Sequence, residues 1–80
     1  MQKFNFIFLR SDKVLVSQKK YSDWKEIQNE FDDYMAHIGF DSIDEIKEYM
    51  QFDYKLNEEK AFKESRKISE SNSDYVEIEL

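Results

Sequence analysis

Four carboxylates recur at a regular spacing in the middle of this sequence, and they are its most suggestive chemical feature. The spacing is i, i+3, i+7 and i+10, which places side chains in one row on a helix, and the residues are Asp23, Glu26, Glu30 and Asp33. At about 1.5 Å per residue, such a row is roughly 15 Å long. A second group follows, formed by Asp44, Glu45 and Glu48. A row of negative charge suits a site built for phosphates or a basic protein patch, so all seven are predicted partner-binding residues.

The charge balance separates this segment from an ordinary solvated helix face. Residues 22–54 carry ten acids and two bases, whereas a face that serves only solubility usually mixes both signs. Residues 1–21 carry five bases and one acid. The net charge of the 80-residue chain is -6, which opposes direct binding to a nucleic-acid backbone. The alternative, that the acids only keep the helices solvated, stays open.

Residue types for catalysis and metal binding are sparse. The single histidine, His37, stands one turn after Asp33 in the predicted helix, where a carboxylate and the helix end favour its protonated form. We interpret it as a helix-end ion pair, with a pH-sensitive contact as the alternative. Without cysteine, and with one glycine, the chain has no thiol nucleophile and no Gly-rich phosphate loop. The acidic doublets do not match a calcium loop. We therefore predict no enzymatic activity, no cofactor and no bound metal.

The basic N-terminal segment predicts a β-hairpin that would support these helices. Phenylalanines alternate with other residues over 4–9, and a β-branched run covers 13–18 after a polar turn. Ile7 and Leu9 fall opposite the phenylalanines, so the first strand is apolar on both sides. Such a strand is either central in its sheet or part of an interface.

The later part of the chain predicts two or three helices and a closing strand. An apolar stripe that follows Ser22, a good N-cap, predicts a first helix. Gly39 is expected to end this helix by adopting a left-handed conformation itself. A capping box from Ser42 to Glu45 opens the second helix. The expected ranges are 23–38 and 43–55 for these helices, 58–67 for a short third helix or irregular segment, and 75–80 for the strand.

Together these elements predict a single α+β domain over residues 1–80. The expected architecture is a three-stranded, mostly antiparallel sheet in ββααβ order, with two or three helices packed on one face. No apolar run approaches the roughly 18 residues that span a membrane. No secretory signal is predicted at the N-terminus, so a cytoplasmic location is expected.

The leading hypothesis is a non-catalytic inhibitor or regulator that presents its carboxylate-rich helices to a basic, nucleic-acid-binding protein, with Tyr34 or Tyr49 as an anchor. In size and charge the chain is similar to nuclease immunity proteins, antitoxins and phage-encoded inhibitors, some of which mimic nucleic acid. The alternative is a structural or accessory protein that acts as a homodimer, which would cover Ile7 and Leu9. Binding to a membrane or directly to nucleic acid is not expected.

Overall fold

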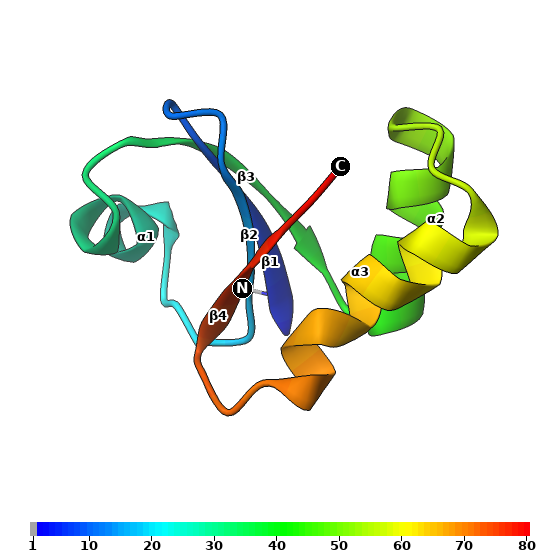
Figure 1. Cartoon of the computed structure of the whole chain (residues 1–80). Coiled ribbons are helices and arrows are strands. Elements are labelled where there is room, and N and C mark those ends of the chain that lie inside the picture. Colours follow the sequence, from blue (N-terminus) through cyan, green and yellow to red (C-terminus); the bar gives the residue numbers. More distant parts are fainter. Residues whose placement is uncertain (1) are drawn as a thin grey trace.

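A computed structural model describes residues 2–80 as a four-stranded antiparallel sheet with three helices (Figure 1). The elements are β1 (Phe4–Leu9), β2 (Val14–Ser17), α1 (Trp24–Glu30), β3 (Tyr34–Phe40), α2 (Ile43–Asp53), α3 (Glu58–Glu70) and β4 (Tyr75–Ile78). Across the sheet the strand order is β3-β1-β2-β4, so β1 and β2 are central and β3 and β4 are edges. The predicted α+β class and antiparallel pairing are confirmed, but the sheet has four strands where three were expected.

The largest departure from the sequence prediction lies between residues 23 and 40. The predicted helix over 23–38 is wrong: α1 ends at Glu30, and β3 pairs with β1 so that Phe6 faces Ile38. The segment fits both periods, because its apolar residues also alternate toward the end. The Asp32-Asp33 doublet forms the turn between the two elements, where Tyr34 N–H donates to the carbonyl of Phe31 at 3.1 Å. Aspartate favours such turns over helix interiors.

Gly39 does not end a helix. It lies inside β3, and no glycine of the described chain has a positive φ. The side chain of Gln2 occupies the space that a Cβ at position 39 would fill. The glycine therefore lets the N-terminal segment approach β3 closely, which is a common reason for glycine inside a strand.

The sheet separates two clusters of buried side chains. The larger cluster lies between the sheet and the α2–α3 layer and is centred on Phe6, whose ring centroid lies 5.3 Å from that of Phe8 and 5.2 Å from that of Tyr49. The smaller cluster joins Ile27 of α1 to residues of β1 and β2. Figure 1 accordingly shows α1 on one side of the sheet and α2 and α3 on the other. The helices cover both faces, not one as predicted.

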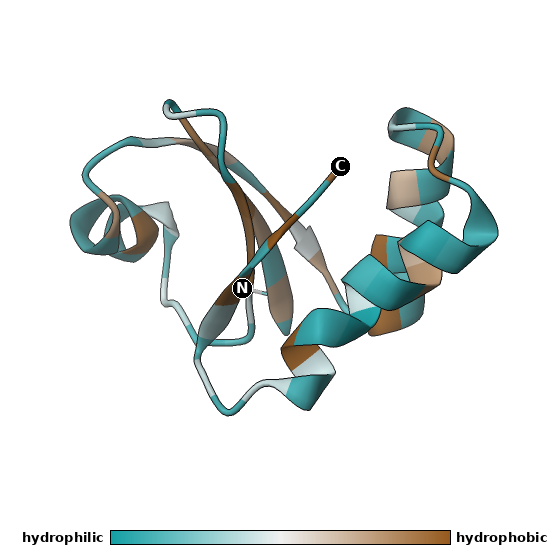
Figure 2. Ribbon diagram, in the orientation of Figure 1, coloured by the Kyte–Doolittle hydropathy of each residue, from teal (hydrophilic) through white to brown (hydrophobic). Residues whose placement is uncertain are grey.

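The hydropathy of the ribbon follows this layering. Figure 2 shows hydrophobic, brown segments along the central strands, whereas most of α3 is hydrophilic. The central position of β1 explains why it is apolar on both sides, since Ile7 and Leu9 are buried within the chain itself. The homodimer that the sequence suggested is not needed to cover these two residues.

The starts of α2 and α3 agree with the sequence prediction. Ser42 Oγ accepts a hydrogen bond from Glu45 N–H at 3.2 Å, and Glu45 Oε1 accepts one from Asp41 N–H at 2.9 Å. These reciprocal contacts satisfy free N–H groups at the start of α2, as a capping box does. Asn57 caps α3 through Lys60 N–H at 2.7 Å. The third helix extends to Glu70, three residues beyond the range expected for it.

Candidate interaction surface

Two carboxylates of the predicted row hold the start of α1. Asp23 is the N-cap and accepts a hydrogen bond from Lys25 N–H at 2.9 Å. Glu26 Oε2 accepts one from Ser22 N–H at 3.1 Å. Both residues are exposed, so their charges still face solvent. Their first role is nevertheless structural, because α1 has seven residues and a short helix depends on its caps.

The other two members of the row are engaged with the N-terminal hairpin. Glu30 forms an ion pair with Lys19 at 2.9 Å, and this carboxylate raises the pKa of the Lys19 ammonium. Asp33 lies outside the helix, where its carboxylate accepts a hydrogen bond from Ser11 Oγ at 2.7 Å. Asp33 therefore does not belong to the predicted row of carboxylates, and the charge of Glu30 is compensated by Lys19.

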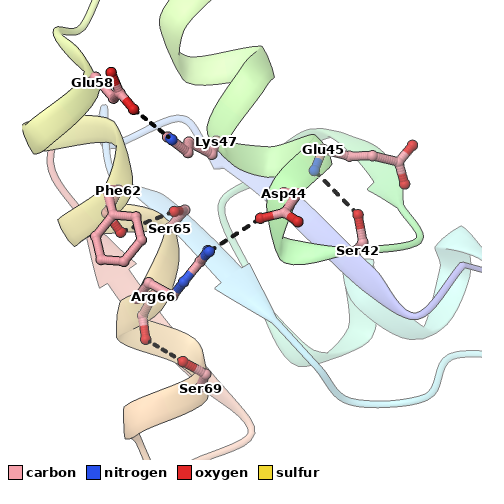
Figure 3. A network of polar contacts seen from close by, with 9 residues as sticks. All are labelled: Ser42, Asp44, Glu45, Lys47, Glu58, Phe62, Ser65, Arg66 and Ser69. Atoms are coloured by element: carbon pink, nitrogen blue, oxygen red, sulfur yellow. Dashed lines mark hydrogen bonds and ion pairs between the residues drawn. The ribbon is translucent and has the colours of Figure 1, made fainter.

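The acids of α2 divide between a contact to α3 and open solvent. Asp44 pairs with the Arg66 guanidinium at 3.1 Å, and this guanidinium lies over the ring of Phe62, 4.5 Å from its centroid. Figure 3 shows Asp44 directed toward Arg66 and Glu45 directed away from α3. Glu48 is exposed and makes no ion pair or side-chain hydrogen bond with the described residues. Glu48 is thus the least compensated of the seven predicted residues, whereas the Glu45 carboxylate accepts the N–H of Asp41 as that of Glu26 accepts the N–H of Ser22.

The seven carboxylates do not form one surface. Asp23, Glu26 and Glu30 belong to α1, which packs on one face of the sheet, and Asp44, Glu45 and Glu48 belong to α2 on the other. The sequence prediction joined them because it placed both helices on the same face. Any partner contact must therefore use one group or the other.

An exposed aromatic residue lies beside Glu45 and Glu48 on α2, and the sequence did not lead us to predict its role. Glu45, Glu48 and Phe52 fall within about 60° of one another around the helix axis, opposite the buried Ile46 and Met50. The side chain of Phe52 is 76% exposed, the highest value among the large hydrophobic residues that the structure describes. The signal available in the sequence was the spacing of seven residues between Glu45 and Phe52, on the side away from the apolar stripe.

We call Asp41, Glu45, Glu48 and Phe52 the α2 outer face. Asp41 adjoins it because its N–H donates to Glu45. The one base of α2, Lys47, is directed elsewhere: it pairs with Glu58 of α3 at 3.5 Å and lies over the ring of Phe62 (Figure 3). The α2 outer face therefore joins three carboxylates to an exposed ring without a base of the same helix among them.

The aromatic anchors that the sequence suggested are occupied inside the protein. Tyr49 packs between Phe6 and Tyr54, and its burial raises the pKa of its hydroxyl. Tyr34 Oη lies 2.7 Å from His37 Nδ1, within hydrogen-bond distance. His37 belongs to β3, opposite Ile7, so the predicted helix-end ion pair with Asp33 is wrong.

One buried carboxylate was not predicted. Glu64 of α3 is 4% exposed, accepts a hydrogen bond from Glu79 N–H at 2.7 Å and pairs with Lys67 at 2.8 Å. Burial alone would raise the pKa of this carboxyl, but the N–H of Glu79 and the Lys67 ammonium together lower it below its ordinary value. Glu64 thus fastens the end of the chain to α3 in its ionised form.

We expect Glu64→Gln to destabilise the protein by about 1–3 kcal/mol at neutral pH, since the amide keeps the contact to Glu79 but loses the charge. A lowered folded-state pKa contributes stability above the ordinary pKa of 4.5 and loses it as pH falls further. The difference between wild type and variant should therefore shrink below that pH. Urea unfolding across pH 3 to 7 measures it, with exposed Glu70→Gln as the control. A difference that does not change with pH would contradict this account.

A hollow at the start of α2 is lined by side chains of both charges. A cavity of about 330 Å³ is lined by Lys3, Phe4, Asp41, Ser42, Ile43, Asp44 and Arg66. Its two bases and two acids give it no preference for ions of one sign.

Within residues 2–80, no group of three His, Asp or Glu side chains is placed to hold a metal ion. No helix in the described chain has the length and apolarity needed to cross a membrane.

The geometry therefore offers the α2 outer face as a candidate interaction surface, and known proteins do not assign it a role. Comparison of the chain with protein-family models, with curated proteins and with solved structures finds no match.

Proposed function

We propose that this protein is a non-catalytic regulator or inhibitor that binds a basic protein through the α2 outer face. The observation that carries the proposal is the exposed ring of Phe52 beside Glu45 and Glu48. The partner belongs to the nucleic-acid-binding class, because such proteins gather Lys and Arg on one surface to hold phosphates.

The two kinds of side chain on this face have complementary roles in binding. A large aromatic ring left in water is a natural anchor, because burying it in a partner's pocket supplies most of the binding energy at such interfaces. The carboxylates contribute attraction at long range, which speeds encounter and selects partners of opposite charge. The net charge of -6 adds to this attraction.

Among the predicted carboxylates, Glu48 of α2 supports this role better than the α1 acids do, since Asp44 pairs with Arg66 and Glu45 accepts the N–H of Asp41. Asp23 and Glu26 are fixed by capping contacts, and Glu30 is paired with Lys19. Binding a basic partner there would compete with contacts that hold α1 in place. Glu48 has no such contact to give up among the described residues.

The alternative function, a structural protein acting through a homodimer, has less support. Its motive was the need to cover Ile7 and Leu9, and α1 covers both through Ile27. Two copies of the α2 outer face would also repel each other, since like charges across an interface are unfavourable.

The test compares two variants of equal charge change. Glu48→Lys combined with Phe52→Ala alters the α2 outer face, and Glu70→Lys makes the same charge change on an exposed residue of α3. We expect the immobilised wild-type protein to capture a basic protein from a lysate of the encoding organism, in a manner that high salt reverses. The double variant should bind that protein at least about tenfold more weakly, and Glu70→Lys should bind it as the wild type does. Equal affinity of all three proteins would remove the α2 outer face from the mechanism.

A further inference from the structure

The two edges of the sheet differ in how they are protected. β4 has four residues and carries an acid in its middle, Glu77, with Glu79 directly after it. β3 has seven residues, Tyr34–Phe40, and none of them is Asp, Glu, Lys, Arg or Pro. Natural proteins usually shorten or charge an edge strand, because its unpaired backbone groups accept strands from other chains. β4 follows this rule, whereas the only such device in the described β3 is a register shift near its start, opposite Phe8 and Leu9, and Ala36–Phe40 pair regularly with β1.

The outer edge of β3 is also open and apolar. No strand within residues 2–80 pairs with that edge. Met35 is 58% exposed and Ile38 is 37% exposed, so apolar side chains stand beside the free backbone groups. An added strand would gain a ladder of hydrogen bonds and contacts to these side chains, which is how strand addition to a sheet edge achieves affinity.

The ends of β3 determine the charge of the strand that fits. Asp32 and Asp33 precede the strand and Asp41 follows it, so carboxylates flank the apolar stretch on both sides. Asp32 is exposed, Asp33 also accepts a hydrogen bond from Ser11, and Asp41 shares a hollow with Lys3 and Arg66. A second copy fits poorly: the antiparallel register that pairs all seven residues places Asp33 opposite Asp41, and like charges at directly opposed positions are destabilising. A strand with Lys or Arg at each end makes the favourable pairs instead.

The open edge adjoins the α2 outer face. α2 begins three residues after β3 ends, and Asp41 belongs to both the flank of the strand and the α2 outer face. In the helical layer, α2 contacts β3 while α3 contacts β4, so α2 lies on the side of the open edge (Figure 1). A partner that docks on α2 therefore has the β3 edge within reach.

We infer that β3 accepts an extended strand of the partner, with an apolar, β-branched middle and a basic residue at each end. This inference rests on the proposed function, because it names how the same basic partner is held. The hydrogen bonds of the added strand supply affinity, and the three flanking aspartates select its charge.

The direct test uses a synthetic strand as the probe. The peptide Lys-Lys-Val-Thr-Val-Thr-Val-Lys-Lys is titrated into the isotope-labelled protein at low ionic strength, and a peptide with Glu in place of every Lys is the control. We expect the largest amide shifts, and slowed amide exchange, in Tyr34–Phe40. The basic peptide should bind at least about tenfold more tightly than the acidic one, since several flanking charge pairs change sign.

Two variants locate the contact on the protein. Met35→Lys places a charge on the open edge at an exposed position and should weaken peptide binding by about tenfold. Glu77→Lys makes its change on the opposite edge and should leave binding unchanged. Circular dichroism melts confirm that both variants fold.

Four outcomes would overturn the inference: shifts confined to α2, equal affinity for the two peptides, no shifts at all, or dimerisation of the protein through β3 without peptide. The proposed function fails separately. If Met35→Lys keeps the captured partner while Glu48→Lys with Phe52→Ala loses it, the α2 outer face stands and strand addition is wrong. If the double variant keeps the partner, the proposed function is wrong whatever β3 does.

Discussion

Phe6→Ala is expected to lower the free energy of unfolding by about 3–5 kcal/mol, which is the usual cost of deleting a buried phenylalanine ring. Phe6 is fully buried, and its ring lies within 6.5 Å, centroid to centroid, of the rings of Phe8, Phe40, Tyr49 and Tyr54. Removing the ring leaves a cavity between the sheet and α2, where the ring now connects the two. A domain of this size has about 4–12 kcal/mol in total, so the loss is a large share of its stability.

Phe52→Ala is the matched control, because it deletes the same side chain where it is 76% exposed. It should change the unfolding free energy by less than about 0.5 kcal/mol, as surface substitutions usually do. Urea unfolding followed by circular dichroism measures both variants. Similar losses in the two proteins would mean that Phe6 is not the centre of the larger core. A neutral Phe52→Ala would show that folding does not depend on this ring.

The parts of the fold that were predictable from the sequence depend on local signals. The hairpin follows from alternating residues on both sides of a polar turn, and α2 from the capping contacts of Ser42 and Glu45. α3 begins at the residue after Asn57, its side-chain cap. In each case short-range hydrogen bonds and one clear periodicity agree, so no knowledge of distant contacts is needed.

The segment from Trp24 to Phe40 was not predictable in the same way. Its apolar residues satisfy a helical period as far as Ile38 and a strand period from Ala36 to Phe40, so periodicity alone does not decide. The strand conformation of residues 34–40 is stabilised by pairing with β1, because β3 occupies the edge of β1 that β2 leaves open. Such a pairing of distant strands is a tertiary effect that overrides local preference. The turn-forming Asp32-Asp33 doublet was the local signal that indicated a break.

The candidate surface was predictable in composition and not in arrangement. The excess of acids is real, but α1 and α2 lie on opposite faces of the sheet, and capping contacts or ion pairs engage most of the predicted carboxylates. Acids are favoured at helix starts for reasons of stability alone, because they interact with the free N–H groups and the helix dipole. Charge counting therefore overstates a binding surface wherever helices begin. Exposure of a hydrophobic residue beside the acids, as at Phe52, is the more specific sign.

Ile27→Ala is expected to cost about 2–5 kcal/mol and to act mainly on α1. Ile27 is the buried residue of this helix, and it packs against Ile7, Leu15 and Tyr21. Seven residues do not form a stable helix in isolation, so α1 depends on this contact. Hydrogen exchange should therefore show amide protection lost throughout α1 and retained in α2. The control is Gln28→Ala, an exposed position on the same helix, with a change below about 0.5 kcal/mol.

Ile27→Ala also tests whether α1 or a second copy of the chain covers Ile7 and Leu9. If α1 is what covers Ile7 and Leu9, its release exposes an apolar sheet face, and Ile27→Ala should self-associate at micromolar concentration while Gln28→Ala does not. Sedimentation velocity at increasing concentration measures this directly. A variant that loses α1 protection yet stays monomeric would mean that the sheet face is covered in another way. A wild-type protein that already dimerises through this face would mean that α1 is displaced in the native state, and the homodimer function would then replace the one proposed for α2.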